Sequence, residues 1–250
     1  MSGEAGIPTA KGPWGPVATI GFTALIFAAF FLAQMGIAVV YLVVLTLASP
    51  RANMQVVAGR LDRDGFLLAV TEVVIGPLVI GLTILIAWLR KGPTIREYLA
   101  LMPVGRRRIL GWLLGIVAVG ALFDVSAYLT NHRSVPEWEL DTVRSAGSLP
   151  LLILALVLIA PVLEEVVFRG FLFEGLRHSR LGPAGAIVVA ALVWAAVHLQ
   201  YEWFYVVQVF VAGLLLGVAR HRTGSLVPPM LMHALMNVTS TLQAVLETRS

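Results

Sequence analysis

Two adjacent carboxylic acids and a guanidinium lie within one apolar segment, at Glu164, Glu165 and Arg169. On a helix, Glu165 and Arg169 are neighbours one turn apart and can form an ion pair. Glu164 points about 100° away from Glu165 around the helix axis, so we expect one carboxylate to be held by the arginine and the other to face a cavity. A structural ion pair needs only one glutamate. The second is therefore a candidate general base or acid, because two carboxylates this close oppose each other's ionisation.

Two histidines and an asparagine supply further polar groups in the apolar segments that follow. His198 comes one turn after Trp194, while His233 and Asn237 are four residues apart and share one helix face. Each of them alone is a weak indication, because a histidine near a helix end is commonly an interfacial residue. Together with the two glutamates they form a group of polar side chains that indicates a function, because an ionisable side chain costs about 3 kcal/mol at the centre of a bilayer.

Two chemistries fit this set. Without a metal, a glutamate would activate a water, and Asn237 or a histidine would donate to the developing oxyanion. With a metal, Glu164, His198 and His233 would hold a divalent ion, for which zinc is the best match to carboxylate and imidazole donors. The residue types leave both open. Two other carboxyl residues, Glu72 and Asp124, lie alone in apolar segments, and we interpret each as an interhelical hydrogen-bonding group or a protonated carboxyl.

The composition identifies the kind of protein that must position these residues. Of 250 residues, 58% are apolar and 13% are charged, and the mean hydropathy is +0.88, which excludes a water-soluble globule. The apolar runs do not alternate with polar residues, as the strands of a transmembrane barrel would. There are no cysteines, so disulfides and thiolate metal sites are excluded.

The apolar runs predict an all-α polytopic membrane protein with about seven transmembrane helices. We expect the last four to form a polar catalytic cavity. The predicted spans cover residues 17–48, 66–89, 109–130, 149–173, 183–199, 203–219 and 225–246.

The basic residues predict the orientation. Alternate connections carry 11 Lys and Arg residues on one side and 6 on the other, and Arg169 lies within a span. By the positive-inside rule, the N-terminus and the loop from Arg90 to Arg108 are cytoplasmic. The isoelectric point near 9.8 fits cationic loops that contact anionic membrane lipids, and we expect no nucleic-acid partner.

Three ordered motifs resemble those of a known family. They are Glu164-Glu165 followed by Arg169, an aromatic residue four before His198, and His233 four before Asn237. They resemble the CAAX-processing and bacteriocin-processing (CPBP or Abi) family of membrane-embedded proteases, also called type II CAAX prenyl endopeptidases. The second motif usually begins with Phe and here begins with Trp194, which keeps an aromatic ring and leaves His198 in place.

The resemblance implies an intramembrane endopeptidase that cleaves a peptide or protein substrate. It implies that Glu164 and Glu165 activate water, Arg169 orders them, His198 and His233 assist or bind a metal, and Asn237 stabilises the oxyanion. The same residues suit a metalloprotease or a glutamate protease. We expect a bacterial inner-membrane protein divided into a cytoplasmic segment (1–16), N-terminal spans and loops (17–144), a catalytic core (145–246) and a tail (247–250).

Two other functions compete with proteolysis. The chain could be a non-catalytic member of the same family, acting as a membrane scaffold or immunity protein. Loss of a motif residue would favour that role, and none is lost. The buried carboxyls could also carry protons in a transporter.

Overall fold

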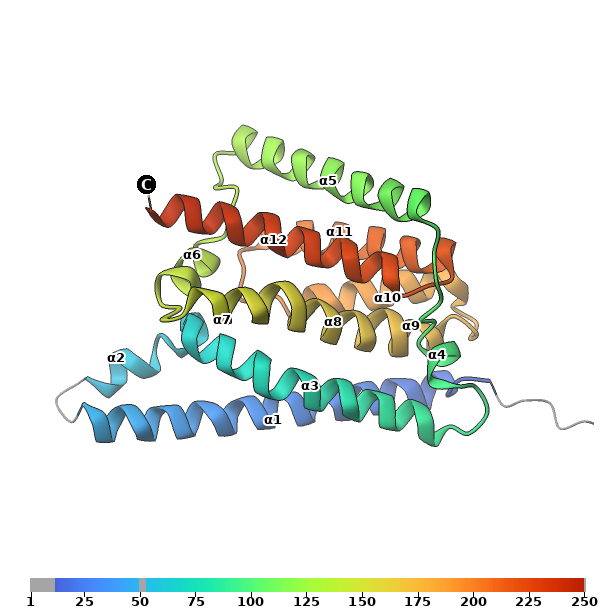
Figure 1. The fold of residues 1–250 in the computed structure, drawn as a ribbon, viewed down its shortest axis with the longest axis horizontal. Helices are drawn as coiled ribbons and strands as arrows, with labels where there is room; N and C mark the ends of the chain where they lie inside the picture. Colours follow the sequence, from blue (N-terminus) through green and yellow to red (C-terminus); the bar gives the residue numbers. More distant parts are fainter. Residues whose placement is uncertain (1–11, 50–52, 250) are drawn as a thin grey trace, which may run out of the picture.

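The structure is a computed structural model that describes residues 12–49 and 53–249, and within these ranges every regular element is helical (Figure 1). The all-α prediction is therefore confirmed. Of the predicted cytoplasmic segment 1–16, residues 1–11 lie outside the described residues. The predicted tail is not a separate element, because the last helix continues to Arg249.

Within the described ranges, five helices are long and apolar enough to cross a membrane, and each corresponds to a predicted span. They are α1 (Pro16–Ala48), α3 (Gly65–Leu89), α5 (Arg106–Leu129), a central helix (Leu149–Leu176) and α11 (Trp203–Thr223). In Figure 1, α1 and α3 lie on one side of the central helix and α5 and α12 on the other.

The other two predicted spans are helices that do not meet the same measure of length and apolarity. Helix α10 (Gly182–Ala196) has 15 residues, which at 1.5 Å per residue is shorter than the roughly 30 Å hydrocarbon core. Helix α12 (Val227–Arg249) has 23 residues, but its second half is rich in Asn, Thr, Ser and Gln. A count of seven full spans stays a prediction.

The central helix is not a regular α-helix. It consists of five consecutive pieces: α7 (Leu149–Ile153), the π-helix η2 (Leu154–Ile159), α8 (Ala160–Glu165), the π-helix η3 (Val166–Leu172) and α9 (Phe173–Leu176). Wide π turns within a helix are uncommon and frequently lie at functional sites. Here they flank the short α8 piece that ends with the two adjacent glutamates.

Short helices connect the spans at both ends of the molecule. They are α2 (Met54–Ala58), the 3-10 helix η1 (Leu61–Arg63), α4 (Ile95–Tyr98) and α6 (Glu137–Arg144). Among them α6 covers one end of the bundle, where it packs against α3 and α12.

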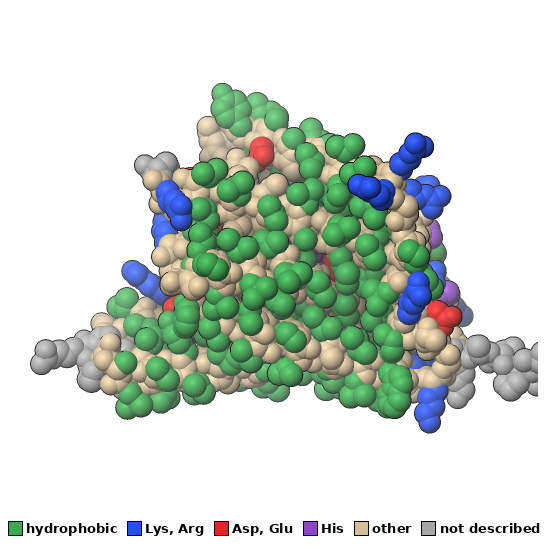
Figure 2. Space-filling view, in the orientation of Figure 1, with side chains coloured by type: hydrophobic (Ala, Val, Ile, Leu, Met, Phe, Trp, Pro, Cys, Tyr) green, Lys and Arg blue, Asp and Glu red, His purple; other side chains and the backbone are tan. Residues whose placement is uncertain are grey.

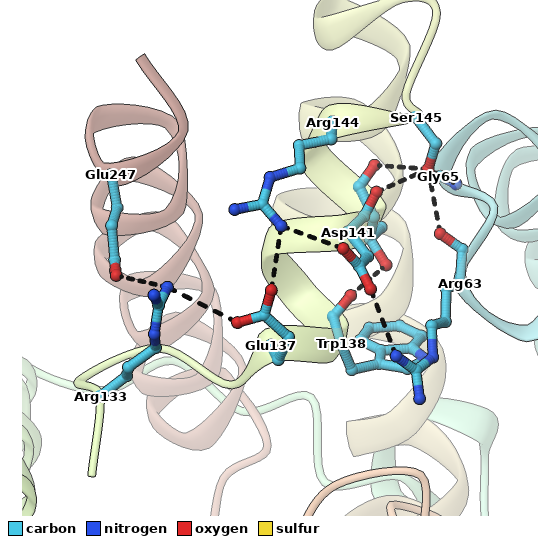
Figure 3. Close-up of polar contacts among 10 residues, drawn as sticks. Arg63, Gly65, Arg133, Glu137, Trp138, Asp141, Arg144, Ser145 and Glu247 are labelled. Atoms are coloured by element: carbon cyan, nitrogen blue, oxygen red, sulfur yellow. Dashed lines mark hydrogen bonds and ion pairs between the residues drawn. The ribbon is translucent and has the colours of Figure 1, made fainter. Parts of the chain in front are cut away.

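Ion pairs on the outer face of α6 fix it in place (Figure 3). Arg133 connects Glu247 of α12 with Glu137 of α6, at 2.9 and 3.5 Å. Arg63 pairs with Asp141 at 3.3 Å and so connects α6 with the start of α3. Single exposed pairs contribute little, about 0–1 kcal/mol, but this network joins three elements. On the inner face of α6, the side chains of Glu139, Leu140 and Thr142 are buried.

The surface fits a protein that spans a membrane. Figure 2 shows hydrophobic side chains over the middle of the molecule and Lys and Arg side chains at its two ends. Many large apolar side chains of α1 are exposed, among them Leu32 and Val40, each at 63%. Exposure of this kind suits contact with lipid tails, because apolar side chains in lipid are not in contact with water.

Candidate functional site

Glu164 and Glu165 have opposite surroundings, as the helical spacing predicted. The Glu165 side chain is 0% exposed and the Glu164 side chain is 22% exposed. Arg169 Nη1 donates to Glu165 Oε1 at 2.8 Å, which confirms the predicted ion pair. Glu164 lines a cavity, which confirms the expectation that one of the two carboxylates faces open space.

Arg169 is held from three sides. Besides Glu165, its Nη2 donates to the carbonyl oxygen of Gly213 in α11 at 3.2 Å. Its guanidinium also lies over the ring of Trp194, 4.5 Å from the ring centroid. A guanidinium can use all three contacts because it is planar and carries several donors. The arginine therefore fixes Glu165 between the central helix, α10 and α11.

His233 of α12 connects the two glutamates. Its Nδ1 lies 2.9 Å from Glu165 Oε1, and because a carboxylate only accepts, we assign the proton to Nδ1. Its Nε2 lies 3.9 Å from Glu164 Oε2. His233 thus packs against the buried acid and reaches toward the exposed one.

Trp194 of α10 holds Glu164. Its indole Nε1 donates a short hydrogen bond to Glu164 Oε2. The rings of His198 and His233 each meet the Trp194 ring edge-on, with centroids 5.3 and 5.2 Å away. The sequence indicated an aromatic residue at this position but not that it would donate to the glutamate, a bond that a Phe cannot make.

His198 lies just beyond the end of α10. Its Nδ1 donates to the carbonyl oxygen of Trp194 at 2.8 Å, which leaves Nε2 as the unprotonated nitrogen of the neutral ring. The short α10 explains this location: the helix starts at Gly182, which has φ +62°, and ends at Ala196. His198 therefore follows the helix rather than lying near the far end of a full span.

Asn237 is oriented by a π-helix. Its Nδ2 donates to the carbonyl oxygen of Leu156 in η2 at 2.7 Å. The amide has a second N–H, and the residue lines the cavity. A carbonyl inside a membrane needs a donor from within the protein, so this bond satisfies the η2 backbone and fixes the amide at the cavity wall.

These side chains surround a cavity of about 680 Å³. Glu164, His198, His233 and Asn237 line it, whereas Glu165 and Arg169 lie behind its wall. The sequence predicted a cavity formed by the last four spans alone, and this set of helices is incomplete. Residues of α1, α3 and α5 also line it, because α1 and α3 pack on the central helix while α5 packs on α12.

The cavity ends beneath α6 at a second carboxyl, that of Glu139. Its Oε2 accepts a hydrogen bond from Ser240 Oγ at 2.6 Å. Burial raises the pKa of Glu139 from 4.5 to about 7, although the bond from Ser240 lowers it. Burial, together with the charges of Glu139 and Glu164, raises the pKa of Tyr201 well above 10.0. The sequence did not indicate Glu139 or Tyr201 as residues of the site. Glu139 lies in a polar connection between two predicted spans, where an acidic residue attracts no attention.

The predicted zinc ligands Glu164, His198 and His233 line one cavity. Trp194 lies against both imidazoles, and the Nδ1 proton of His233 faces Glu165, which leaves Nε2 as the acceptor nitrogen of that ring. Within the described ranges, no group of three or more His, Asp or Glu side chains could hold a metal. A zinc site needs three or four ligands at about 2 Å, and zinc binding stays a prediction.

The two isolated carboxyls differ. Asp124 Oδ2 accepts a hydrogen bond from Gln243 of α12 at 3.5 Å, so the interhelical bond expected there is confirmed. Glu72 Oε2 is buried and has no hydrogen-bond partner among the described residues, so the interhelical bond is not formed there, and the other alternative, a protonated carboxyl, stays a prediction.

Comparison with known proteins gives the family. The model of the Rce1-like type II CAAX prenyl endopeptidases matches residues 146–239, which include all six predicted site residues. The chain belongs to this family, and with its long apolar helices it is an integral membrane protein.

Relatives with similar sequences come from several bacteria. An uncharacterised 24.3 kDa protein of Escherichia coli is 31% identical over 146 residues, which is 55% of this chain and 67% of the relative. The uncharacterised protein YpbD of Bacillus subtilis is 27% identical over 147 residues, 57% of this chain and 72% of the relative. The UPF0177 protein YbdI of Lactococcus lactis is 28% identical over 108 residues, 40% and 58% of the two chains. No solved structure matches the chain significantly.

Proposed function

We propose that this protein is an intramembrane endopeptidase in which Glu164 activates the water that hydrolyses a peptide bond. One observation carries the proposal: of two adjacent glutamates, one is locked in a buried ion pair and the other faces the cavity. Family membership supports hydrolysis of a peptide bond as the reaction.

The reaction needs one group that takes a proton and returns it. Glu164 removes a proton from a water while the water oxygen adds to the carbonyl carbon of the peptide, and the carbonyl electron pair moves onto its oxygen. When this intermediate collapses, the C–N bond breaks and the leaving nitrogen takes the proton from Glu164. The products are a carboxylic acid and an amine, which become a carboxylate and an ammonium by transfer of the acid proton, and Glu164 returns to its starting state.

Asn237 is the group that can donate to the developing oxyanion, and His198 is a group that can hold the attacking water. The free N–H of Asn237 is a neutral donor whose orientation is fixed by the bond to Leu156. Such preorganised donors lower the barrier because they do not have to reorient during the reaction. The Nε2 of His198 carries no proton in the orientation described, so it accepts a hydrogen bond from a cavity water.

Glu165 and Arg169, from behind the cavity wall, and His233, in the wall itself, position Glu164. They connect the central helix with α10, α11 and α12. Because catalytic geometry must be held within fractions of an ångström, this buried group is what keeps Glu164 aimed into the cavity.

The test is a comparison of membrane peptides between cells that make the wild-type protein and cells that make Glu164→Gln. The amide keeps the shape of the side chain but cannot take the proton. New peptide termini should appear only with the wild type and with Glu202→Gln, a matched change at an exposed position that does not line the cavity. If Glu164→Gln restores the phenotype of a deletion strain as well as the wild type does, the protein acts instead as a scaffold. Proton-driven solute flux into liposomes that survives Glu164→Gln would indicate transport.

A further inference from the structure

Within the described chain, the wall of the cavity holds acidic residues and two histidines but no Lys or Arg. Among its lining residues, which all lie in the described part of the chain, there are five acids and no Lys or Arg. The acids are Asp62, Glu72, Asp124, Glu139 and Glu164. This is unexpected in a protein with a formal net charge of +4. A cavity lined by carboxylates favours positively charged ligands and opposes anionic ones.

Elsewhere the protein pairs its buried acids with its own cations. Glu165 has Arg169 at 2.8 Å, and Glu174 has Arg177 at 2.8 Å and Arg220 at 2.9 Å. Such pairing is expected because a desolvated carboxylate without a partner is costly. The acids of the cavity therefore differ from those that the fold uses to hold its helices together.

Glu72 is the cavity acid with the least compensation. Asp62 has Arg63, Asp124 has Gln243, Glu139 has Ser240 and Glu164 has Trp194. By contrast, Glu72 Oε2 is buried and has no hydrogen-bond partner within the described chain.

Two buried hydroxyls at the same cavity also have no partner. Thr71, next to Glu72 on α3, is 1% exposed, and Thr241 of α12 is 4% exposed. The Oγ1 atoms of both lack a hydrogen-bond partner in the described structure, and both residues line the cavity. Since buried polar groups are normally hydrogen-bonded, these hydroxyls are free to bind a water or a polar group of a ligand.

We infer that Glu72 determines specificity by binding a positively charged group of the substrate, a lysine or arginine side chain or an amino group, next to Glu164. This inference rests on the proposed function and names its substrate class: an apolar peptide segment with a cation close to the bond that is cleaved. The described fold provides arginine partners for Glu165 and Glu174 but none for Glu72. The positive group of the substrate would be the cationic partner of Glu72. An acidic segment would be rejected by the like charge of the wall.

Cleavage of matched peptides by the detergent-purified full chain tests the inference. The peptides share one apolar sequence and differ at a single position, which carries Lys, Gln or Glu and is moved along the peptide. At the best position we expect kcat/KM for Lys to exceed that for Gln by about tenfold, with Glu the poorest. Glu72→Gln should bring the ratio of Lys to Gln close to one, and Glu202→Gln should leave the ratio as in the wild type.

A binding measurement separates failure of this inference from failure of the proposed function. In Glu164→Gln protein, fluorescence anisotropy of the same labelled peptides should show tighter binding of Lys than of Gln, and the added Glu72→Gln change should remove the difference. Equal dissociation constants for the two peptides would overturn the inference even where cleavage depends on Glu164. A preference for Lys that depends on Glu72, in a protein that cleaves no peptide, would overturn the proposed function and leave this site standing.

Discussion

The indole of Trp194 donates to the carboxylate of Glu164 across the interface between α10 and the central helix. The same ring lies under the guanidinium of Arg169 and contacts both imidazoles of the site. One side chain thus connects the cavity-facing acid with the buried group behind it. The resemblance identified only the aromatic ring at this position, and the structure adds a donor that Phe lacks.

Replacing Trp194 with Phe separates the two roles of this side chain. The ring is kept and the N–H is lost, so kcat should fall by about tenfold, the effect of one hydrogen bond to a charged group. Trp194→Leu also removes the ring and should cost more. Trp203→Phe, at an exposed indole, is the matched control and should behave as the wild type. Full activity of Trp194→Phe would show that the indole bond does not position Glu164.

Replacing Arg169 with Lys tests the buried clamp. An ammonium cannot bind Glu165 and the Gly213 carbonyl in the same planar geometry, nor stack as well on Trp194. We expect activity between that of the wild type and that of Glu164→Gln, together with a loss of roughly 3 kcal/mol in the free energy of unfolding. Thermal unfolding in detergent, beside turnover, measures both. Arg63→Lys at the half-exposed pair with Asp141 should change stability by less than about 1 kcal/mol, and a similar loss in both variants would contradict the argument.

Sequence patterns within one helix predicted the site well. The ion pair of Glu165 with Arg169, the outward direction of Glu164 and the common face of His233 and Asn237 all follow from the spacing of a helix. These relationships are local, so they survive whatever the helices pack against. The apolar runs predicted seven spans, and five of these are helices in the described structure that are long and apolar enough to cross a membrane.

Contacts between helices were not predictable in this way. Nothing in the sequence around Glu72 indicates that α3 packs beside α8, so its place near Glu164 needed the structure. The π segments were also missed, because their sequences are ordinary apolar runs; they form where side chains such as Asn237 and Arg220 bond to the Leu156 and Arg169 carbonyls.

The orientation in the membrane is a prediction with a direct test. Figure 2 shows Lys and Arg side chains at both ends of the apolar surface, and the loop from Arg90 to Arg108 carries the largest basic cluster. A reporter fused after Arg108 should therefore indicate the cytoplasm, and one fused near Glu139 the opposite side. Equal reporter signals at the two positions would refute this arrangement.

Removal of metal tests the alternative chemistry. The arrangement of Glu164, His198 and His233 around Trp194 does not form a three-ligand site, so we expect prolonged chelation to leave peptide cleavage unchanged. The metal content of the purified protein should be measured in the same preparation. Stoichiometric zinc that is lost together with activity, and restored with it on re-addition, would mean that the site rearranges to bind the ion.

The stability of the protein should depend on pH through Glu139. Burial raises the pKa of this carboxyl from 4.5 to about 7, so between these values the folded state binds a proton that the unfolded chain has released. The contribution of Glu139 to the free energy of unfolding therefore falls as the pH rises from about 4.5 to 7, by an amount on the order of 3 kcal/mol.

Glu139→Gln isolates that contribution, because the amide oxygen can still accept the bond from Ser240 but does not titrate. Between pH 5 and pH 8 the thermal midpoint in detergent should fall less for this variant than for the wild type. Glu137→Gln, on the exposed face of the same short helix, should keep the slope of the wild type. The thermal midpoint could instead fall equally with pH in the wild type and in Glu139→Gln. In that case Glu139 is not the group whose ionisation opposes folding, and the carboxyl beneath α6 is not protonated at neutral pH.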